Sequence, residues 1–374
     1  SIIMLTKLKT LLKASYSIKR PKQKKILIFD RTSIKGGLAD KIFKNNEFEV
    51  LDTRYENINL YVLFFVLLNT GFKNLKFNYF KYFLEFVSPK IVYTGIDNQL
   101  DFFKLKSIYN KATYISDQFA ISKNAYAAFK KGIKKDFYWR CKEYLKKSNS
   151  KLFADVIFTF GQNNIDDMSK FIDGNYYALG STKNNFKKFK KKKIKKINKI
   201  TFICSGKYIK TIDDEKKVFK NLLRFGKENN IKINFLGRNN YDEESFYRKT
   251  YSMGNWTYLA KTSLNSSYQH LDNSQMIVFT HGTLGFEALS KGIKVAAFYS
   301  HFPEKGTYLK YKRKGPFWTN STSYTDFEKI VKKVINYPDK KWSSIVKKYS
   351  KEILAYDSEN RIKKLIINKI KNKI

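Results

Sequence analysis

Cysteine is the scarcest residue type in this 374-residue sequence, which contains only Cys141 and Cys204. Two isolated cysteines form no pair of metal ligands and make no disulfide framework. The sequence therefore predicts neither a zinc site nor a disulfide-stabilised scaffold. It fits a reducing compartment such as the cytoplasm.

Several catalytic motifs are also absent. No D-x-D triplet occurs, which argues against a sugar-nucleotide site built on a divalent metal between two aspartates. The absence of a P-loop, of G-x-S-x-G and of H-E-x-x-H removes the common NTPase, hydrolase and zinc-protease interpretations. The glycines after the first predicted strand, Gly36 and Gly37, do not form the G-x-G-x-x-G fingerprint of an NAD site. We expect no metal and no cofactor.

Acidic residues are few compared with basic ones. The 74 lysines and arginines outnumber the 32 acidic residues, giving a formal net charge of +42, and only nine of the basic residues are arginine. Specific base and phosphate recognition favours the arginine fork, so the lysine excess argues against a nucleic-acid partner. The excess fits a lysine-biased composition, with attraction to an anionic membrane surface as the alternative.

Long apolar runs are missing. The longest, LYVLFFVLL at 60–68, is about half of the roughly 20 residues that a spanning helix needs, so it predicts a buried helix or a surface-docking element. The composition, 43% apolar and 28% charged, is that of a folded globular protein, and the length favours two domains.

Short apolar runs alternate with helical patterns along the whole chain, which is typical of a parallel α/β sheet. Thr325 and Glu328 form a candidate capping box for a helix toward Ile335. The predicted strands cover residues 25–30, 90–95, 112–116, 156–160, 200–204, 231–236, 276–280 and 294–298, and the clearest predicted helices cover 213–229 and 284–291.

A lysine-rich segment divides the chain. Residues 183–199 read KNNFKKFKKKKIKKINK, a run of like charge that predicts a solvated linker, with contact to anionic lipid as a compatible role. We therefore predict an N-terminal Rossmann-like domain at 1–182, the linker at 183–199, a second Rossmann-like domain at 200–340 and a basic helix at 341–374. A ligand is expected at the carboxyl ends of the strands, in the cleft between the domains.

The sharpest local feature is VFTHGTLGFEAL at 278–289, in which a strand, a glycine turn and a helix follow one another directly. Free N–H groups at a helix start make a phosphate seat. In this interpretation Gly282 allows close backbone approach, Thr283 caps the helix or donates to a phosphate oxygen, and Glu287 reaches ribose hydroxyls. An ordinary strand-to-helix turn remains the alternative.

Titratable residues at strand ends are the candidates for chemistry. His281 lies beside the predicted phosphate seat and is either catalytic or structural, whereas His270 and His301 are expected to be structural. Asp97, followed by Asn98, comes after the strand at 90–95 and is either a general base toward an acceptor hydroxyl or a helix cap. Candidate acceptor contacts are Gly36, Gly37, Asn98 and Asp117.

The segment from Asp272 to Phe298 resembles the S-T-x-G-x-E-A-L-x-x-G-K-x-V segment of bacterial surface-carbohydrate (O-antigen and capsule) biosynthesis proteins with the GT-B glycosyltransferase fold. Weaker similarity to that group is scattered over most of the chain, at 200–208, 235–238, 267–268 and 314–320 in the second half and at 58–63, 96–98 and 178–181 in the first. His281 departs from the pattern, because the group has a small polar residue there.

The resemblance implies two Rossmann-like domains facing across a cleft, with a nucleotide-sugar donor in the C-terminal domain and a glycan or lipid-linked glycan acceptor in the N-terminal domain. Thr283, Gly285 and Glu287 would contact the donor nucleotide, and Ser205 and Gly206 would close over its phosphates. The full candidate donor set is Ser205, Gly206, Lys207, Arg238, Gly282, Thr283, Leu284, Gly285 and Glu287.

We thus predict a metal-independent glycosyltransferase of O-antigen, capsule or lipopolysaccharide biosynthesis, with Asp97 and His281 as catalytic candidates. A CMP-linked ulosonic acid is among the donors that the resemblance allows. The alternatives are a sugar-nucleotide epimerase of the same fold, a non-catalytic basic module that binds anionic membrane or nucleic acid, and an inactive relative. The expected location is the cytoplasm or the inner face of the cytoplasmic membrane.

Overall fold

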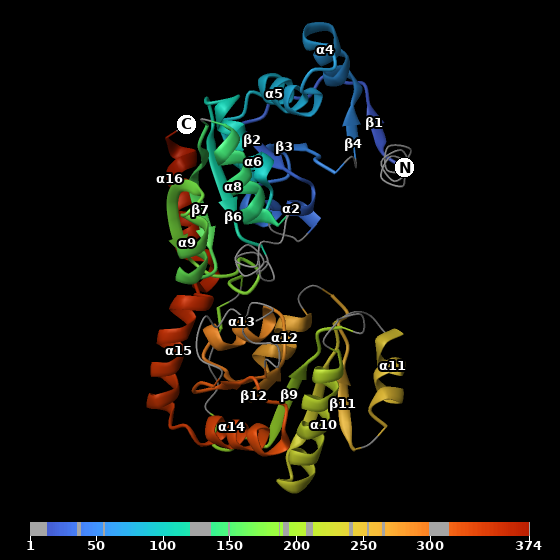
Figure 1. Ribbon diagram of the computed structural model, residues 1–374, viewed down its shortest axis with the longest axis vertical. Helices are drawn as coiled ribbons and strands as arrows, with labels where there is room; N and C mark the ends of the chain where they lie inside the picture. Colours follow the sequence, from blue (N-terminus) through green and yellow to red (C-terminus); the bar gives the residue numbers. More distant parts are fainter. Residues whose placement is uncertain are drawn as a thin grey trace.

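Figure 1 shows the computed structural model of the chain, in which two α/β domains lie one above the other. The described residues are 13–35, 39–54, 57–119, 136–148, 150–186, 188–189, 194–206, 212–238, 242–252, 254–263, 266–298 and 314–373. The two Rossmann-like domains predicted from the sequence are confirmed.

The N-terminal domain is built on a six-stranded sheet in the order β3-β2-β5-β6-β7-β8, and every strand pair in it is parallel. Its central strands are short runs of isoleucine, valine, phenylalanine and tyrosine, which suit a sheet that is covered on both faces. The strands are β2 (Ile26–Phe29), β3 (Phe48–Leu51), β5 (Ile91–Thr94), β6 (Thr113–Asp117), β7 (Leu152–Thr159) and β8 (Ile172–Ala178).

Helices cover this sheet, and a separate two-stranded parallel sheet of β1 (Ser15–Ser17) and β4 (Asn57–Asn59) lies beside α4 at the far end of the domain (Figure 1). Among the described residues, no helix combines the length and apolarity needed to cross a membrane. The helices of this half are α2 (Thr32–Lys35), α3 (Ala39–Ile42), α4 (Leu60–Thr70), α5 (Leu75–Val87), α6 (Leu100–Lys104), α8 (Phe137–Lys147) and α9 (Gln162–Met168), with a 3-10 turn at Leu105–Ser107.

The C-terminal domain has a second six-stranded parallel sheet, in the Rossmann order β11-β10-β9-β12-β13-β14. Its strands are β9 (Lys199–Ile203), β10 (Lys232–Leu236), β11 (Trp256–Leu259), β12 (Met276–Phe279), β13 (Lys294–Phe298) and β14 (Trp318–Thr319). Its helices are α10 (Ile212–Glu228), α11 (Asp242–Thr250), α12 (Ser266–Asp272), α13 (Leu284–Ser290) and α14 (Tyr324–Asn336).

Each sheet has one point at which the strand order changes direction. This switch point lies between β2 and β5 in the N-terminal domain and between β9 and β12 in the C-terminal domain. In Figure 1, α2 follows β2 on the side of its domain that faces the other domain, and α13 follows β12 on the opposing side. Ligands of open parallel sheets bind at the carboxyl ends of the strands at such points.

The end of the chain differs from the single basic helix predicted from residue 341. It forms α15 (Asp339–Ile353), a 3-10 turn (Ser358–Asn360) and α16 (Arg361–Asn372). Trp342 of α15 is buried in the C-terminal core, whereas Ile367 of α16 is buried in the core of the N-terminal sheet. The break occurs where Ala355 N–H donates to Phe160 O of the N-terminal domain (2.7 Å), so the chain returns to its first domain.

The predicted capping box is also displaced by two residues. The hydroxyl of Ser323 accepts from the Asp326 N–H (3.3 Å), and it lies 3.1 Å from the Asp326 carboxylate. Ser323 and Asp326 therefore cap α14, in place of Thr325 and Glu328.

The lysine-rich segment begins inside the protein, not in solvent. Asn184 and Asn185 are buried, and the Asn184 amide donates to Glu287 O (3.2 Å) and Ser290 Oγ (3.0 Å) of the C-terminal domain. Burial also lowers the pKa of the Lys183 ammonium. Where it is described, the start of this segment joins the two domains through specific contacts, unlike the solvated linker that its charge predicts.

Candidate functional site

The switch point of the C-terminal domain is organised by one buried carboxylate. Glu215, in the first turn of α10, accepts from the Ser205 N–H (2.8 Å) and from the Thr280 hydroxyl (3.3 Å) through its Oε2. Burial raises the pKa of Glu215, and the hydrogen bonds from Ser205 and Thr280 oppose that rise. The loops after β9 and β12 are thereby tied together, with the Ser205 and Thr280 hydroxyl oxygens 3.5 Å apart.

An exposed cation lies over this junction. The Arg238 guanidinium, just after β10, donates to the Ser205 carbonyl oxygen (2.6 Å), and the Arg238 N–H donates to the Glu243 carboxylate (3.0 Å). Gly206 has φ +103°, and a Cβ there would lie 3.1 Å from Arg238 Cδ. The turn after β9 thus needs glycine and holds an arginine fork at the strand ends, an arrangement suited to a phosphate.

The turn after β12 contains the predicted phosphate seat. Gly282 has φ +95°, and a Cβ placed there would meet no atom of the described residues within 4 Å. Thr283 precedes α13 without making a side-chain capping bond, and Gly285 packs on the Phe279 ring, which a Cβ would meet at 2.3 Å. Gly285 therefore serves strand–helix packing, while the half-buried His281 stays a candidate beside Gly282.

Glu287 lies at the junction of the domains. Its carboxylate accepts from the Tyr268 hydroxyl (3.1 and 3.3 Å), and only 4% of the residue is exposed. Burial raises the pKa of Glu287, although the hydrogen bonds from Ser181 and Tyr268 act to lower it. This geometry favours a structural role over the predicted ribose contact.

On the N-terminal side, Asp97 follows β5 at the switch point and is buried. Desolvation, together with the nearby negative charge of Asp117, raises the pKa of Asp97 to about 7. A carboxyl group with that pKa exchanges protons readily at neutral pH.

The neighbouring Asp117 has a different environment. The Lys363 ammonium of α16 donates to Asp117 Oδ1 (2.7 Å), and the hydroxyls of Tyr93 and Thr182 donate to Oδ2 (2.9 and 2.8 Å). Both charged side chains are almost completely buried. Asp117, predicted as an acceptor contact, therefore has the partners of a structural ion pair.

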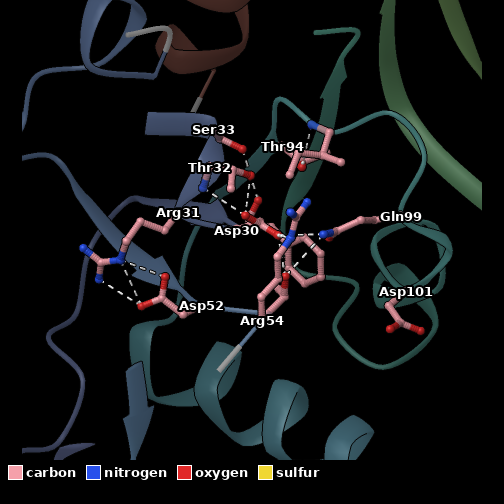
Figure 2. Close-up of polar contacts among 12 residues, drawn as sticks. Asp30, Arg31, Thr32, Ser33, Asp52, Arg54, Thr94, Gln99 and Asp101 are labelled. Atoms are coloured by element: carbon pink, nitrogen blue, oxygen red, sulfur yellow. Dashed lines mark hydrogen bonds and ion pairs between the residues drawn. The ribbon is translucent and has the colours of Figure 1, made fainter. Parts of the chain in front are cut away.

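The sequence did not predict a cluster around Asp30, which directly follows β2 at the same switch point (Figure 2). The buried Asp30 carboxylate accepts from the Thr32 N–H (2.9 Å), Thr53 Oγ1 (2.6 Å), Arg54 Nε (3.1 Å) and Gln99 Nε2 (2.6 Å). Burial alone would raise the pKa of Asp30, but the hydrogen bonds from Thr32, Thr53 and Gln99 outweigh it and lower the pKa. Asp30 is held as an anion.

Next to this cluster, Arg31 makes a bidentate ion pair with Asp52 (2.9 Å), also drawn in Figure 2. Asp52 borders a cavity of about 210 Å³ between β1, β3, β4 and α5. The cavity is lined by three basic side chains, two carboxylates and several amide and aromatic groups, including Lys19, Arg20, Lys22, Glu49, Asp52, Asn57, Asn59 and Tyr79. Its mixture of hydrogen-bond donors and acceptors suits a hydroxyl-rich ligand.

The remaining predicted residues add little. Asn98 is exposed, and its carbonyl oxygen accepts from Arg140 (3.4 Å); Leu284 packs against the C-terminal core. His270 Nε2 lies within hydrogen-bond distance of Ala260 O (3.2 Å), which fits a structural role. Gly36, Gly37, Lys207 and His301 lie outside the described residues. Within the described part of the chain, no group of three or more His, Cys, Asp and Glu side chains could hold a metal.

Two facing Rossmann-like domains of this kind define the GT-B fold. Known structures with the fold include the UDP-GlcNAc 2-epimerase from Neisseria meningitidis bound to UDP-GlcNAc, with 12% identity, TM-score 0.53 and coverage of 94% of this chain and 100% of that one. Another is a UDP-N-acetylglucosamine 2-epimerase with 13% identity, TM-score 0.52 and coverage of 91% and 93%. At this identity the likeness establishes the fold.

The sequence match is confined to the C-terminal part. Residues 207–371, less than half of the chain, match the model of a family described as "putative O-antigen biosynthesis protein". No curated protein matches the sequence. The resemblance to surface-carbohydrate biosynthesis proteins is confirmed: this is a GT-B-fold protein whose C-terminal part is similar to proteins of O-antigen biosynthesis.

Proposed function

We propose that this chain is a glycosyltransferase that moves a sugar from a nucleotide-sugar donor to a surface-glycan acceptor. The observation that carries the proposal is Asp97, a buried carboxyl group at the N-terminal switch point with a pKa of about 7. At the C-terminal switch point, the phosphates of the donor would be bound by Arg238, the Gly206 turn and the Gly282 turn.

In this proposal Asp97 takes the proton from the acceptor hydroxyl while the oxygen of that hydroxyl forms a bond to the anomeric carbon of the donor sugar. The bond between that carbon and the donor phosphate oxygen breaks, and the electron pair leaves with the nucleotide. Arg238 stabilises the negative charge that develops there. The cavity beside Asp52 is the proposed site for the acceptor.

An epimerase of the same fold is the second candidate, because the same proton-accepting Asp97 could act on the sugar of the donor itself. Proton removal and return on opposite faces of one carbon needs a second acid–base group. Of the two nearby carboxylates, Asp117 is paired with Lys363 and Asp30 is held as an anion by its hydrogen-bond donors. Among these carboxylates of the N-terminal switch point, Asp97 is therefore the one suited to exchange protons, which supports the transferase proposal.

Product analysis separates these candidates. A thermal-shift screen with CMP, UDP, GDP and TDP first identifies the nucleotide, because a ligand at 100 times its dissociation constant stabilises the fold by about 2.7 kcal/mol. The matching nucleotide-sugars are then incubated with and without a cell-envelope extract. A transferase releases free nucleotide only with the extract; conversion of the sugar without it would establish the epimerase instead. No shift with any nucleotide would contradict both.

Arg238→Ala is expected to weaken binding of the identified nucleotide by about tenfold or more, because a charge-assisted hydrogen bond to phosphate contributes about 1.5–3 kcal/mol. Isothermal titration calorimetry gives the affinities. Arg224→Ala is the matched control, since Arg224 is exposed and pairs with Glu228 within its own helix. Equal affinities for the two variants would remove Arg238 from the donor site.

A further inference from the structure

Helix α4 is apolar around its whole circumference, but only one side of it is packed. Val62 and Val66 are buried, and the Phe65 ring lies 5.3 Å from that of Tyr82 and 5.2 Å from that of Phe86 on α5. These contacts hold α4 against α5 at the end of the N-terminal domain (Figure 1). Among the described residues, no element covers the opposite side of the helix.

That opposite side carries a row of large apolar side chains spaced four residues apart, which we call the α4 ridge: Leu60, Phe64, Leu68 and Phe72. Their exposed fractions rise along the row from 36% through 63% and 68% to 82%. Residues four apart lie on one side of a helix, and Phe72 extends the row into the turn after Gly71. Exposed apolar surface of this kind marks an interaction site.

The four side chains of the α4 ridge carry no hydrogen-bonding groups, and the polar residues at the end of α4 each make a hydrogen bond within the helix. The Asn69 amide donates to Phe65 O (2.7 Å), and the Thr70 hydroxyl donates to Val66 O (3.0 Å), both within the helix. Protein interfaces usually include about one hydrogen bond per 100–200 Å², which fixes their register. Because the α4 ridge has no hydrogen-bonding groups, it suits a partner that does not have to be aligned by hydrogen bonds.

The surroundings of the α4 ridge are basic. No charged residue occurs from Leu60 to Phe72, and β1 contacts α4 beside the exposed Ile18. The two segments that form this end of the domain, 13–22 and 57–87, contain one acidic residue, Glu85, against Lys13, Lys19, Arg20, Lys22, Lys73, Lys76 and Lys81. Apolar side chains bordered by lysines are complementary to a bilayer with anionic headgroups.

We propose that the α4 ridge inserts into the headgroup region of an anionic lipid bilayer and docks the N-terminal domain there. This surface differs from the lysine-rich segment at 183–199, whose described start is buried between the domains. The docking is independent of the transferase reaction, so loss of either property leaves the other testable. It places the cavity beside β1 close to the membrane.

Site-directed fluorescence tests insertion directly. Because Cys141 and Cys204 are buried, a new exposed cysteine can be labelled selectively with an environment-sensitive NBD probe. Leu68→Cys tests the ridge, and Leu365→Cys on α16, 51% exposed in the parent chain, is the control that senses non-specific adsorption of a protein with charge +42. With vesicles of phosphatidylglycerol and phosphatidylcholine (1:1), we expect blue-shifted, brighter emission at position 68 and no change at position 365.

Vesicle co-sedimentation supplies the energetic test. The triple variant Phe64→Ser/Leu68→Ser/Phe72→Ser is expected to bind these vesicles at least tenfold more weakly, because each lost apolar group removes favourable burial. The double variant Ile362→Ser/Leu365→Ser, at the exposed apolar residues of α16, should bind like the wild type. Thermal melting confirms that both variants fold.

Three outcomes would overturn the proposal. A probe at position 68 that stays in a water-like environment on vesicles excludes insertion. Equal losses in the triple and double variants assign vesicle binding to the overall charge. A dimer in the free protein that the triple variant converts to monomer, as measured by light scattering, makes the α4 ridge a protein interface instead.

Discussion

Asp97→Asn is expected to lower turnover by about 10²- to 10⁴-fold while leaving nucleotide affinity unchanged, because it removes the proposed base and no donor contact. Single-turnover kinetics and calorimetry measure the two quantities. Asp101→Asn is the matched control: Asp101 lies four residues away, pairs with Lys76 (2.8 Å) and lies apart from the Asp30 cluster in Figure 2. Full activity in the Asp97 variant would refute its role.

The pH profile gives an independent check on Asp97. Its base form accumulates as the pH rises through about 7, so turnover should increase by about tenfold per unit below that value and level off above it. The Asp97→Asn variant should lack this limb. A wild-type profile without a limb near pH 7 would contradict the assignment.

The same substitution should raise stability at alkaline pH. The folded-state pKa of Asp97 lies above its ordinary value, so the native state binds more protons than the unfolded state between about pH 4 and pH 7. The contribution of Asp97 to the free energy of unfolding is fully present below that interval, and it falls by about 1.4 kcal/mol per pH unit as the pH rises through the interval. At pH 8, Asp97→Asn should therefore melt at a higher temperature than the wild type.

Lys363→Met is expected to destabilise the fold by about 3–5 kcal/mol, because it leaves the Asp117 carboxylate buried without its counter-ion. The loss should separate α16 from the N-terminal sheet, since Lys363 is its buried ionic contact with β6. Urea unfolding followed by circular dichroism measures the change.

Lys364→Met is the control for this effect, since the adjacent Lys364 is exposed. It should alter stability by less than about 0.5 kcal/mol. The double variant Asp117→Asn/Lys363→Met should recover part of the loss, because it removes the unpaired charge. Similar stability in the two single variants would mean that the buried ion pair does not hold α16.

The strands that could be predicted from the sequence are those in the middle of each sheet. β2, β5, β9 and β12 are buried on both faces and read as continuous apolar runs. Within the two six-stranded sheets, the strands without a prediction are the edge strands β3, β8, β11 and β14, and the short strands β1 and β4 of the separate sheet were not predicted either. β8 reads IDGNYYA and is largely exposed, and β14 has two residues, so neither gives an apolar run.

The candidate site was predictable where its residues are close in sequence. The turn after β12 places Gly282 and His281 beside one another, whereas the Asp30 cluster joins Thr53, Arg54 and Gln99 from 23, 24 and 69 residues away. Only the sheet order brings those side chains together. Likewise, no local pattern relates Asp117 to Lys363, so the sequence alone predicts an acceptor contact for Asp117 and not an ion pair.

The ion pair between Asp117 and Lys363 also has a consequence for biosynthesis. The two residues are 246 positions apart, so at about 5–20 residues per second a ribosome takes about 12 to 50 s to synthesise the lysine after the aspartate. During that interval the first domain lacks both the ammonium and the apolar side of α16. The first domain therefore cannot complete its core until translation has passed α16.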